Sequence, residues 1–202
     1  LTSGNQTRGH RIHAPNPITI TNAQRYAEQL KDEGFVLADF AARRSLVADL
    51  VNAEAAKLGG VAVIDADLLD EVTALVEWPV ALAGRFEERF LSVPAEALIS
   101  SMKEHQKYFH LVDANGALLP YFITLANLIS QDPAQVIAGN EKVIRPRLSD
   151  AAFFFTTDCQ TRLEQQREKL KSVMFQAQLG SLYDKSERLS HLAGVMADLL
   201  GW

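Results

Sequence analysis

The hydrophobic positions of this chain alternate between short apolar runs and longer helical repeats. Four consecutive apolar residues stand at 61–64 and again at 80–83; the first run predicts a buried strand and the second predicts the next strand. Between them, residues 67–76 have the apolar spacing of an amphipathic helix. A longer helix is predicted ahead of them, capped by Asp39 and ended by Gly59-Gly60. Its apolar face carries Phe40, Val47, Leu50, Val51 and Leu58.

Residues 107–112 and 118–126 predict a β-hairpin, because Asn115-Gly116 between them supplies the backbone conformation that a tight turn needs. Pro120 has no N–H to donate, so it should place the second strand at a sheet edge or delay its start. Strands interleaved with helices then indicate an α+β fold. We expect a mixed, partly antiparallel sheet with surrounding helices, followed by a helical C-terminal segment.

Shorter elements precede the long helix. Residues 18–20 alternate like a brief strand, and residues 35–38 predict another one. Between them, Thr21 and Gln24 have the spacing of a capping box that opens a helix toward Lys31.

The pattern changes after residue 127. Residues 132–138 predict a short helix that Gly139-Asn140 ends, and Pro146 should bend the segment 141–155. From Thr161 the chain is largely helical, and a final amphipathic helix is predicted at 186–200. Its apolar stripe has too little chain left to cover it: Leu189, Leu192, Val195, Met196 and Leu199.

Composition narrows the class of protein. The chain has 202 residues, 48% of them hydrophobic, which is enough for a core, and no apolar run approaches the roughly 20 residues of a membrane helix. Cys159 is the only cysteine, which excludes an internal disulfide framework and a thiolate zinc cluster. We therefore expect a cytoplasmic protein without membrane partners. Leu1 stands where an initiator methionine would, which indicates a segment of a longer chain.

The net charge of −5 is unevenly distributed. Residues 32–99 carry thirteen acidic and five basic side chains, whereas residues 100–202 carry eleven of each. Ahead of Asp32, four basic residues face a single glutamate. Contacts with a polyanion are therefore expected from the beginning and the second half of the chain, and not from the acidic middle.

Three segments carry candidate contact residues. At 101–110, Lys103 and Lys107 offer cationic donors, His105 can hydrogen-bond and Tyr108 offers a stacking face, which together suit an anionic, planar partner such as RNA. The other two segments contribute the remaining candidates: Arg8, His10, Arg11, Arg145 and Arg147.

Two of these segments have a plainer interpretation. Two histidines three residues apart at His10 and His13 suggest a metal site, but a solvated, basic loop or edge strand is favoured because no third ligand is near. Arg145 and Arg147 fit a phosphate-facing cluster and an ion pair with a carboxylate such as Asp150 equally well. Both interpretations stay open.

The sequence shows no motif of a catalytic centre. It has no glycine-rich phosphate loop and no nucleophile elbow, and nothing orients Cys159 as a nucleophile. We therefore predict no catalytic residue, no metal ligand and no cofactor in this chain.

Several strings resemble one family, the beta subunit of the bacterial heterotetrameric glycyl-tRNA synthetase. They are Met102-Lys-Glu-His-Gln-Lys-Tyr-Phe109, Thr7-Arg-Gly-His-Arg11 and Gly139-Asn-Glu-Lys-Val-Ile-Arg-Pro-Arg-Leu-Ser-Asp-Ala-Ala-Phe-Phe154. The family usually has an aromatic residue where this chain has Ile12. The resemblance implies that residues 1–130 form an α+β module similar to that of phenylalanyl-tRNA synthetase beta subunits. Residues 131–202 would then be a mainly helical segment leading into a truncated HD-like helical domain.

The resemblance also implies a function. In this family the alpha subunit activates glycine with ATP and Mg²⁺, and the beta subunit supports tRNA(Gly) recognition and assembly. The candidate residues named above would then contact tRNA or the alpha subunit. Two alternatives remain: an editing hydrolase acting on mischarged tRNA, as in the phenylalanine system, and a purely structural assembly domain.

Overall fold

The structure is a computed structural model that describes residues 4–202. The chain forms two compact units, the first extending to Ala152 and the second comprising Phe153–Trp202. Helix α5 (Pro133–Cys159) begins in the first unit and ends in the second. The division predicted after residue 130 rests on family resemblance and stays a prediction.

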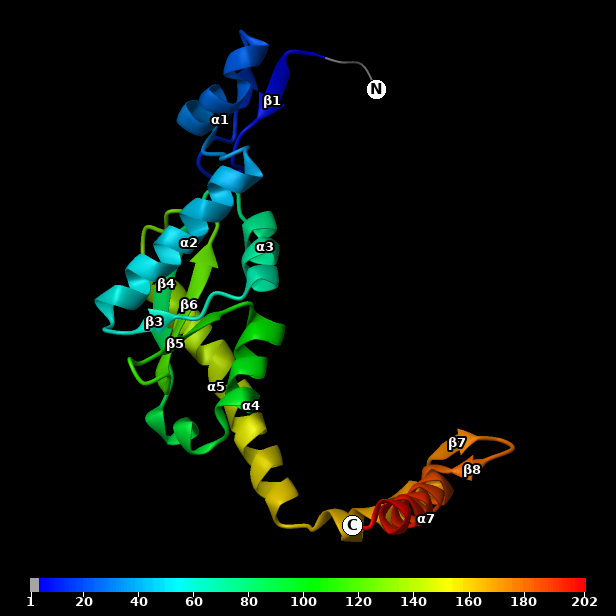
Figure 1. The fold of residues 1–202 in the computed structure, drawn as a ribbon. Helices are drawn as coiled ribbons and strands as arrows, with labels where there is room; N and C mark the ends of the chain where they lie inside the picture. Colours follow the sequence, from blue (N-terminus) through cyan, green and yellow to red (C-terminus); the bar gives the residue numbers. More distant parts are fainter. Residues whose placement is uncertain (1–3) are drawn as a thin grey trace. The chain divides into compact units, whose positions relative to one another are not determined.

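A four-stranded sheet forms the centre of the first unit (Figure 1). Its strands are β3 (Val61–Ala62), β5 (Phe109–Val112), β6 (Leu118–Ala126) and β4 (Val80–Arg85), in that spatial order. Every neighbouring pair is antiparallel. The predicted α+β class, the four strands and the hairpin of β5 and β6 are confirmed. The burial predicted for the strand at 61–64 is wrong for Val61, which is 60% exposed, and the strand ends at Ala62.

The effects predicted for Pro120, an edge position or a late start of its strand, are not found. Strand β6 lies between β5 and β4, so the prediction of an edge strand is wrong, and the strand begins two residues before the proline. His110 pairs with Phe122 but Val112 pairs with Leu118, so a bulge gives β6 extra residues at this point. The missing N–H of Pro120 falls in the bulge, while its carbonyl accepts a 3.0 Å hydrogen bond from Phe86.

The first hydrophobic core lies between one sheet face and two helices, α2 (Phe40–Lys57) and α3 (Ala66–Leu75). The helices begin at aspartates: Asp39 accepts a hydrogen bond from the N–H of Ala42, and Asp65 accepts one from that of Leu68. The predicted cap and both helices are confirmed. The core includes Val47, Val51, Leu68, Val72, Phe109, Leu111 and Ile123.

A second core covers the opposite sheet face, because neighbouring strand residues such as Phe122 and Ile123 point to opposite sides. The 3-10 helix Glu88–Ser92, α4 (Ala95–Ser100) and α5 supply the cover. The sheet is thus enclosed between two helical layers. The core contains Phe86, Phe90, Val93, Leu98, Met102, Tyr108, Phe122, Ile144 and Leu148.

Helix α5 continues past Gly139-Asn140, where the sequence predicted that it would end, so the prediction of a short helix at 132–138 is wrong. The reason is packing: Ile144 and Leu148, one turn apart, are completely buried in the second core. Pro146 stands inside the helix, where it cannot donate the usual backbone hydrogen bond. Burial of the apolar face outweighs these local costs.

Residues 4–39 add a small hairpin and a helix. Strands β1 (Gln6–Arg8) and β2 (Pro17–Thr19) pair antiparallel, ahead of a 3-10 turn at Ala23–Arg25 and α1 (Tyr26–Gly34). Asn22 caps this start, not the predicted Thr21. The strand expected at 35–38 is absent from the described residues, because Phe35 ends α1 with a φ of 52°.

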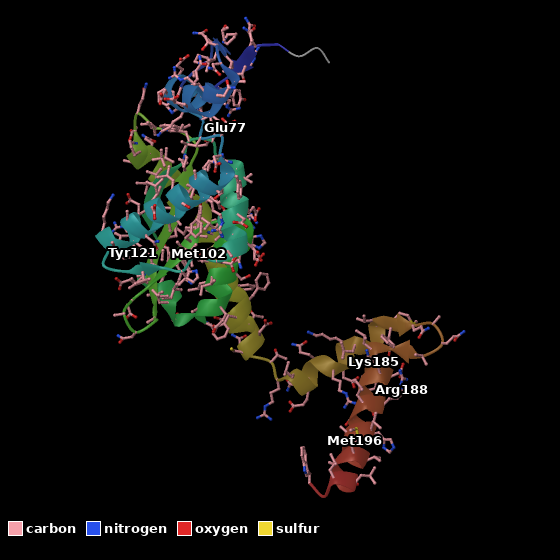
Figure 2. The ribbon with its side chains drawn as sticks, turned by 45° about the horizontal axis from the view of Figure 1, so that its top comes forward. Glu77, Met102, Tyr121, Lys185, Arg188 and Met196 are labelled. Carbon is pink, nitrogen blue, oxygen red and sulfur yellow. The ribbon has the colours of Figure 1, made fainter. Side chains whose placement is uncertain are left out.

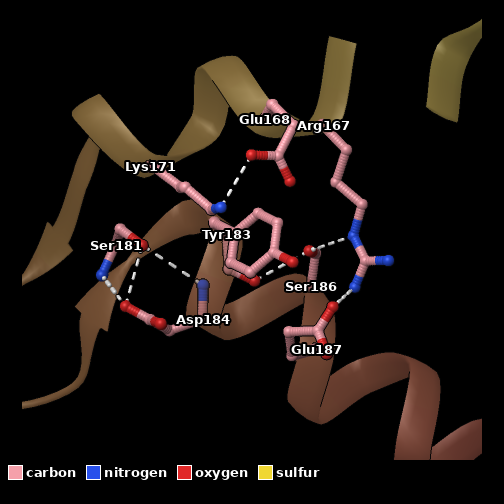
Figure 3. A network of polar contacts seen from close by, with 8 residues as sticks. All are labelled: Arg167, Glu168, Lys171, Ser181, Tyr183, Asp184, Ser186 and Glu187. Carbon is pink, nitrogen blue, oxygen red and sulfur yellow. Dashed lines mark hydrogen bonds and ion pairs between the residues drawn. The ribbon is translucent and has the colours of Figure 1, made fainter. Parts of the chain in front are cut away.

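The second unit contains α6 (Leu163–Gln166), a 3-10 turn at Arg167–Ser172, the two short strands β7 (Met174–Gln176) and β8 (Gly180–Ser181), and α7 (Leu182–Leu200). The β7–β8 hairpin was not predicted. Helix α7 begins four residues earlier than predicted, because Ser181 and Asp184 form a capping box (Figure 3). Lys185, Arg188 and Met196 mark this helix in Figure 2.

Candidate nucleic-acid interface

The segment 101–110 contains an uncommon backbone. Helix α4 passes directly into a π-helix at Ser101–His105, and π-helical turns occur frequently at functional sites. Met102, labelled in Figure 2, is completely buried and fixes this turn to the second core. Lys107 follows with a φ of 60°, a backbone conformation that residues other than glycine rarely adopt. The backbone therefore sets the direction of the candidate side chains.

Both lysines of this segment are paired with carboxylates of the α3 region. The ammonium of Lys103 lies 2.8 Å from an Asp65 oxygen, and that of Lys107 lies 2.9 Å from a Glu71 oxygen. The hydrogen bond from Lys103 lowers the pKa of Asp65 and, reciprocally, raises that of the lysine. These ion pairs hold the π-helical segment against α3. They also neutralise the positive charges of the two lysines, which a phosphate would otherwise contact.

Tyr108 and His105 differ in exposure. Tyr108 is buried: its ring stacks on Phe122 at a centroid distance of 4.4 Å, and its hydroxyl donates a 2.6 Å hydrogen bond to Asn140 of α5. Burial raises the pKa of Tyr108 to about 12. His105 is exposed. The stacking face expected of Tyr108 is thus occupied by Phe122 within the first unit.

The segment around residue 10 is anchored by its histidine. His10 is only 2% exposed, its Nδ1 accepts hydrogen bonds from the N–H groups of Ile12 and His13, and its Nε2 bonds the carbonyl oxygen of Asn127. Since Nδ1 accepts, Nε2 carries the proton. His10 is therefore a buried residue that fixes the loop, and the prediction of a solvated segment is wrong at this position.

Arg8 and Arg11 lie on the outside of that loop and are exposed. Within residues 4–202, neither guanidinium forms an ion pair. The close approach of Gly9 to Gly34 explains the glycine between them, because an added Cβ would lie 2.6 Å from the Gly34 backbone. The loop thus offers two uncompensated cations on a fixed backbone.

Asn127 is a structural residue that sequence reasoning missed. Its side-chain oxygen accepts hydrogen bonds of 2.7 and 2.9 Å from the N–H groups of Glu77 and Trp78. Its backbone carbonyl oxygen accepts a hydrogen bond from Nε2 of His10. The partners lie 49 to 117 residues away in sequence. No local pattern signals such an arrangement.

The two arginines of α5 have different surroundings. Arg145 donates from Nε to Glu87 at 2.5 Å, so its carboxylate partner is Glu87 and not the predicted Asp150. Arg147 is exposed and has no carboxylate partner among the described side chains. The two interpretations left open by the sequence therefore separate: Arg145 is ion-paired and Arg147 is available.

A metal centre would require clustered ligand side chains, and a membrane-spanning segment would require a long apolar helix. Across residues 4–202, no three histidine, cysteine, aspartate or glutamate side chains gather as metal ligands would. None of the described helices combines the length and the apolar character that crossing a bilayer requires.

Comparison with known proteins gives the class first: the relatives are subunits of aminoacyl-tRNA synthetases. A family model described as "Glycyl-tRNA synthetase beta subunit" matches residues 1–201, and the chain belongs to this family. The resemblance seen in the sequence motifs is confirmed.

Individual relatives agree with the family. The chain is 63% identical over 201 residues to the "Glycine--tRNA ligase beta subunit" of Marinobacter nauticus, covering 99% of this chain and 29% of that protein. It is 58% identical to the protein of the same description in Hahella chejuensis, covering 98% of this chain and 28% of the relative. The chain thus spans less than a third of the length of these relatives.

Proposed function

We propose that this chain belongs to the part of a glycine-tRNA ligase beta subunit that holds tRNA(Gly) while another subunit performs the chemistry. The cations Arg8, Arg11 and Arg147 carry the proposal, because each is exposed and uncompensated by a carboxylate within the described residues. Phosphate contacts of this kind supply most of the sequence-independent affinity for nucleic acid. His105, exposed on the π-helical turn, is a further contact residue.

The ion-paired cations have a secondary part in this proposal. Lys103, Lys107 and Arg145 would meet tRNA or the alpha subunit only by exchanging Asp65, Glu71 and Glu87 for a new partner. His10 and Tyr108 act indirectly, by fixing the segments that carry the exposed cations.

The partners and cofactors follow from the family. The alpha subunit would bind ATP and Mg²⁺ and activate glycine, and the complete enzyme would work in the cytoplasm, where tRNA is charged. A separate tRNA-holding subunit lowers the entropic cost of bringing the acceptor end to the activated amino acid.

The test replaces Arg8 and Arg11 with alanine in the beta subunit of the complete enzyme and measures tRNA(Gly) affinity at several salt concentrations. Affinity should fall, and the slope of log K against log salt should decrease by about one for each phosphate that the arginines no longer neutralise. Lys57→Ala is the matched control, because this exposed lysine lies on α2 and pairs with Glu54. Unchanged affinity and slope in the double variant would refute the proposal.

Two further measurements separate the alternatives. A purely structural domain predicts unchanged tRNA affinity together with a shift in heterotetramer assembly, which sedimentation measures. An editing hydrolase predicts that the chain deacylates mischarged tRNA without the alpha subunit.

A further inference from the structure

His13 lies in the loop between β1 and β2, two residues after Arg11, and its side chain is half-buried. Its Nε2 accepts a 3.0 Å hydrogen bond from the backbone N–H of Ile129, which follows β6. The two residues are 116 positions apart in the sequence, so this bond ties the loop to the segment that leaves the central sheet. The tRNA contacts proposed above do not account for it.

The direction of this hydrogen bond defines the protonation state of His13. The backbone N–H of Ile129 can only donate, so Nε2 must offer its lone pair, and the proton of the neutral ring is on Nδ1. A protonated imidazole carries a hydrogen on both nitrogens and accepts from neither. Protonation of His13 would therefore bring two N–H groups against each other and break the bond to Ile129.

The neighbouring imidazole has the same requirement. The rings of His10 and His13 stack at a centroid distance of 4.7 Å, and Nδ1 of His10 accepts from the N–H groups of Ile12 and His13. Two positively charged rings at this distance would repel each other. His10 is only 2% exposed, so His13 is the ring of the pair that can exchange a proton with solvent while the loop is folded.

The surroundings of His13 do not favour a positive charge. Within residues 4–202, neither imidazole of the pair lies within 4 Å of a carboxylate oxygen. The ring of His13 also meets Phe35 at a centroid distance of 5.1 Å, and Phe35 meets Trp78 edge-on. The charged side chains that the loop and the neighbouring segments carry closest to these contacts are all exposed: Arg11, Lys31, Asp32, Glu33, Glu77 and Asp132.

We propose that His13 is a positioning residue for the loop that displays Arg8 and Arg11, and that it holds this loop only while its ring is neutral. The hold is present at alkaline pH and is lost as the pH falls through the range in which histidines titrate, about pH 8 to 5. A released loop no longer keeps its arginines in register with the phosphates, so tRNA binding should weaken on acidification. This last step rests on the proposed function, whereas the effect on the loop does not.

The first test follows the full chain by NMR between pH 8 and pH 5, without tRNA. The backbone amide proton of Ile129 should move upfield as the pH falls, with the same midpoint as the ring signals of His13. His13→Gln keeps an acceptor that does not titrate, so the Ile129 amide should then stay in place. His13→Leu has no acceptor and should give the acid position of this amide already at pH 8. An Ile129 amide in the unaltered chain that stays unchanged over this range would overturn the proposal.

The second test measures the tRNA(Gly) affinity of the complete enzyme at pH 8 and at pH 5.5, at constant ionic strength. On acidification, the unaltered enzyme should lose at least threefold more affinity than the His13→Gln enzyme. His191→Gln is the matched control, because it removes an exposed histidine of α7, and its loss should equal that of the unaltered enzyme.

The double replacement of Arg8 and Arg11 described above separates the two proposals. If it weakens tRNA binding, an equal loss of affinity in His13→Gln and the unaltered enzyme would refute the role of His13. A gain in affinity on acidification that requires His13 would refute it too, because the charged ring would then act as a further cation. If the double variant binds tRNA normally, the proposed function fails, and the Ile129 amide alone decides whether His13 holds the loop.

Discussion

The two units of this chain are built on different physical principles. The first encloses a sheet between two cores, and twelve of the side chains described there are at most 1% exposed. In the second, no described residue is buried, and the apolar side chains of α7 remain exposed, including Leu192, Met196 and Leu199. The predicted stripe without cover is confirmed for these residues.

Polar contacts take the place of a core in the second unit. Figure 3 shows Arg167 joined to Ser186 and Glu187, and Lys171 joined to Glu168. Both cations also lie over the ring of Tyr183. Exposed ion pairs contribute little to stability because solvent and salt screen them. The comparison therefore teaches that secondary structure can be well specified locally while the stabilising apolar contacts are missing.

The largest expected effect is the loss of cooperative folding when the units are separated. Residues 4–159 should retain a cooperative thermal transition, because both cores are complete in them. Residues 153–202 should show only the partial, gradually melting helicity of an isolated amphipathic helix. Circular dichroism during heating measures both. A sharp transition in the 153–202 peptide would contradict the comparison.

Removing one aromatic side chain from each unit should show the same difference in stability between the units. Phe122→Ala should lower the free energy of unfolding by about 3–5 kcal/mol, because the ring is completely buried and stacks on Tyr108. Phe154→Ala is the matched control: its side chain is 62% exposed, and the change should stay within about 0.5 kcal/mol. Urea denaturation measures both values. Similar losses in the two variants would contradict the assignment of the cores.

Tyr108 should make the first unit sensitive to alkaline pH. Its pKa is raised to about 12 in the folded state and is about 10 in the unfolded chain, so its contribution is intact below pH 10 and is lost as pH rises toward 12. Tyr108→Phe should lower the free energy of unfolding by about 1 kcal/mol at pH 7, since the hydrogen bond to Asn140 is lost. Denaturation of both proteins at pH 7 and above pH 10 measures this: their free energies of unfolding should differ at pH 7 and become more similar above pH 10. A difference that is the same at both pH values would show that the hydroxyl is not buried.

A similarly small effect is expected in the second unit. Ser181→Ala should destabilise α7 by about 1 kcal/mol, because the capping box with Asp184 is lost. Ser190→Ala, on the exposed part of the same helix, should leave the helicity unchanged or slightly raised. Circular dichroism at 222 nm measures the difference. Equal helicity in the two variants would argue against the cap.

Local signals explain what the sequence could predict about the fold. Asp39 as a cap and Asn115-Gly116 as a turn act within a few residues, so α2 and the hairpin were predictable. Helix α5 was not, because its continuation past Gly139 depends on Ile144 and Leu148 meeting side chains from distant segments.

The candidate site divides in the same way. The motifs identified the cations, but whether each is available depends on carboxylates far along the chain: Asp65 lies 38 residues from Lys103, and Glu87 lies 58 residues from Arg145. Arg8 and Arg147 look no different in sequence from their paired counterparts. Only the folded arrangement separates available from compensated charge.

The hydrogen bonds of Asn127 have a mechanical consequence. One residue at the end of β6 fastens both the loop that displays Arg8 and Arg11 and the turn that contains Trp78. Tilting that loop away from the first unit would break the hydrogen bond between His10 and the carbonyl oxygen of Asn127, so the position of the loop is coupled to the central sheet through this contact.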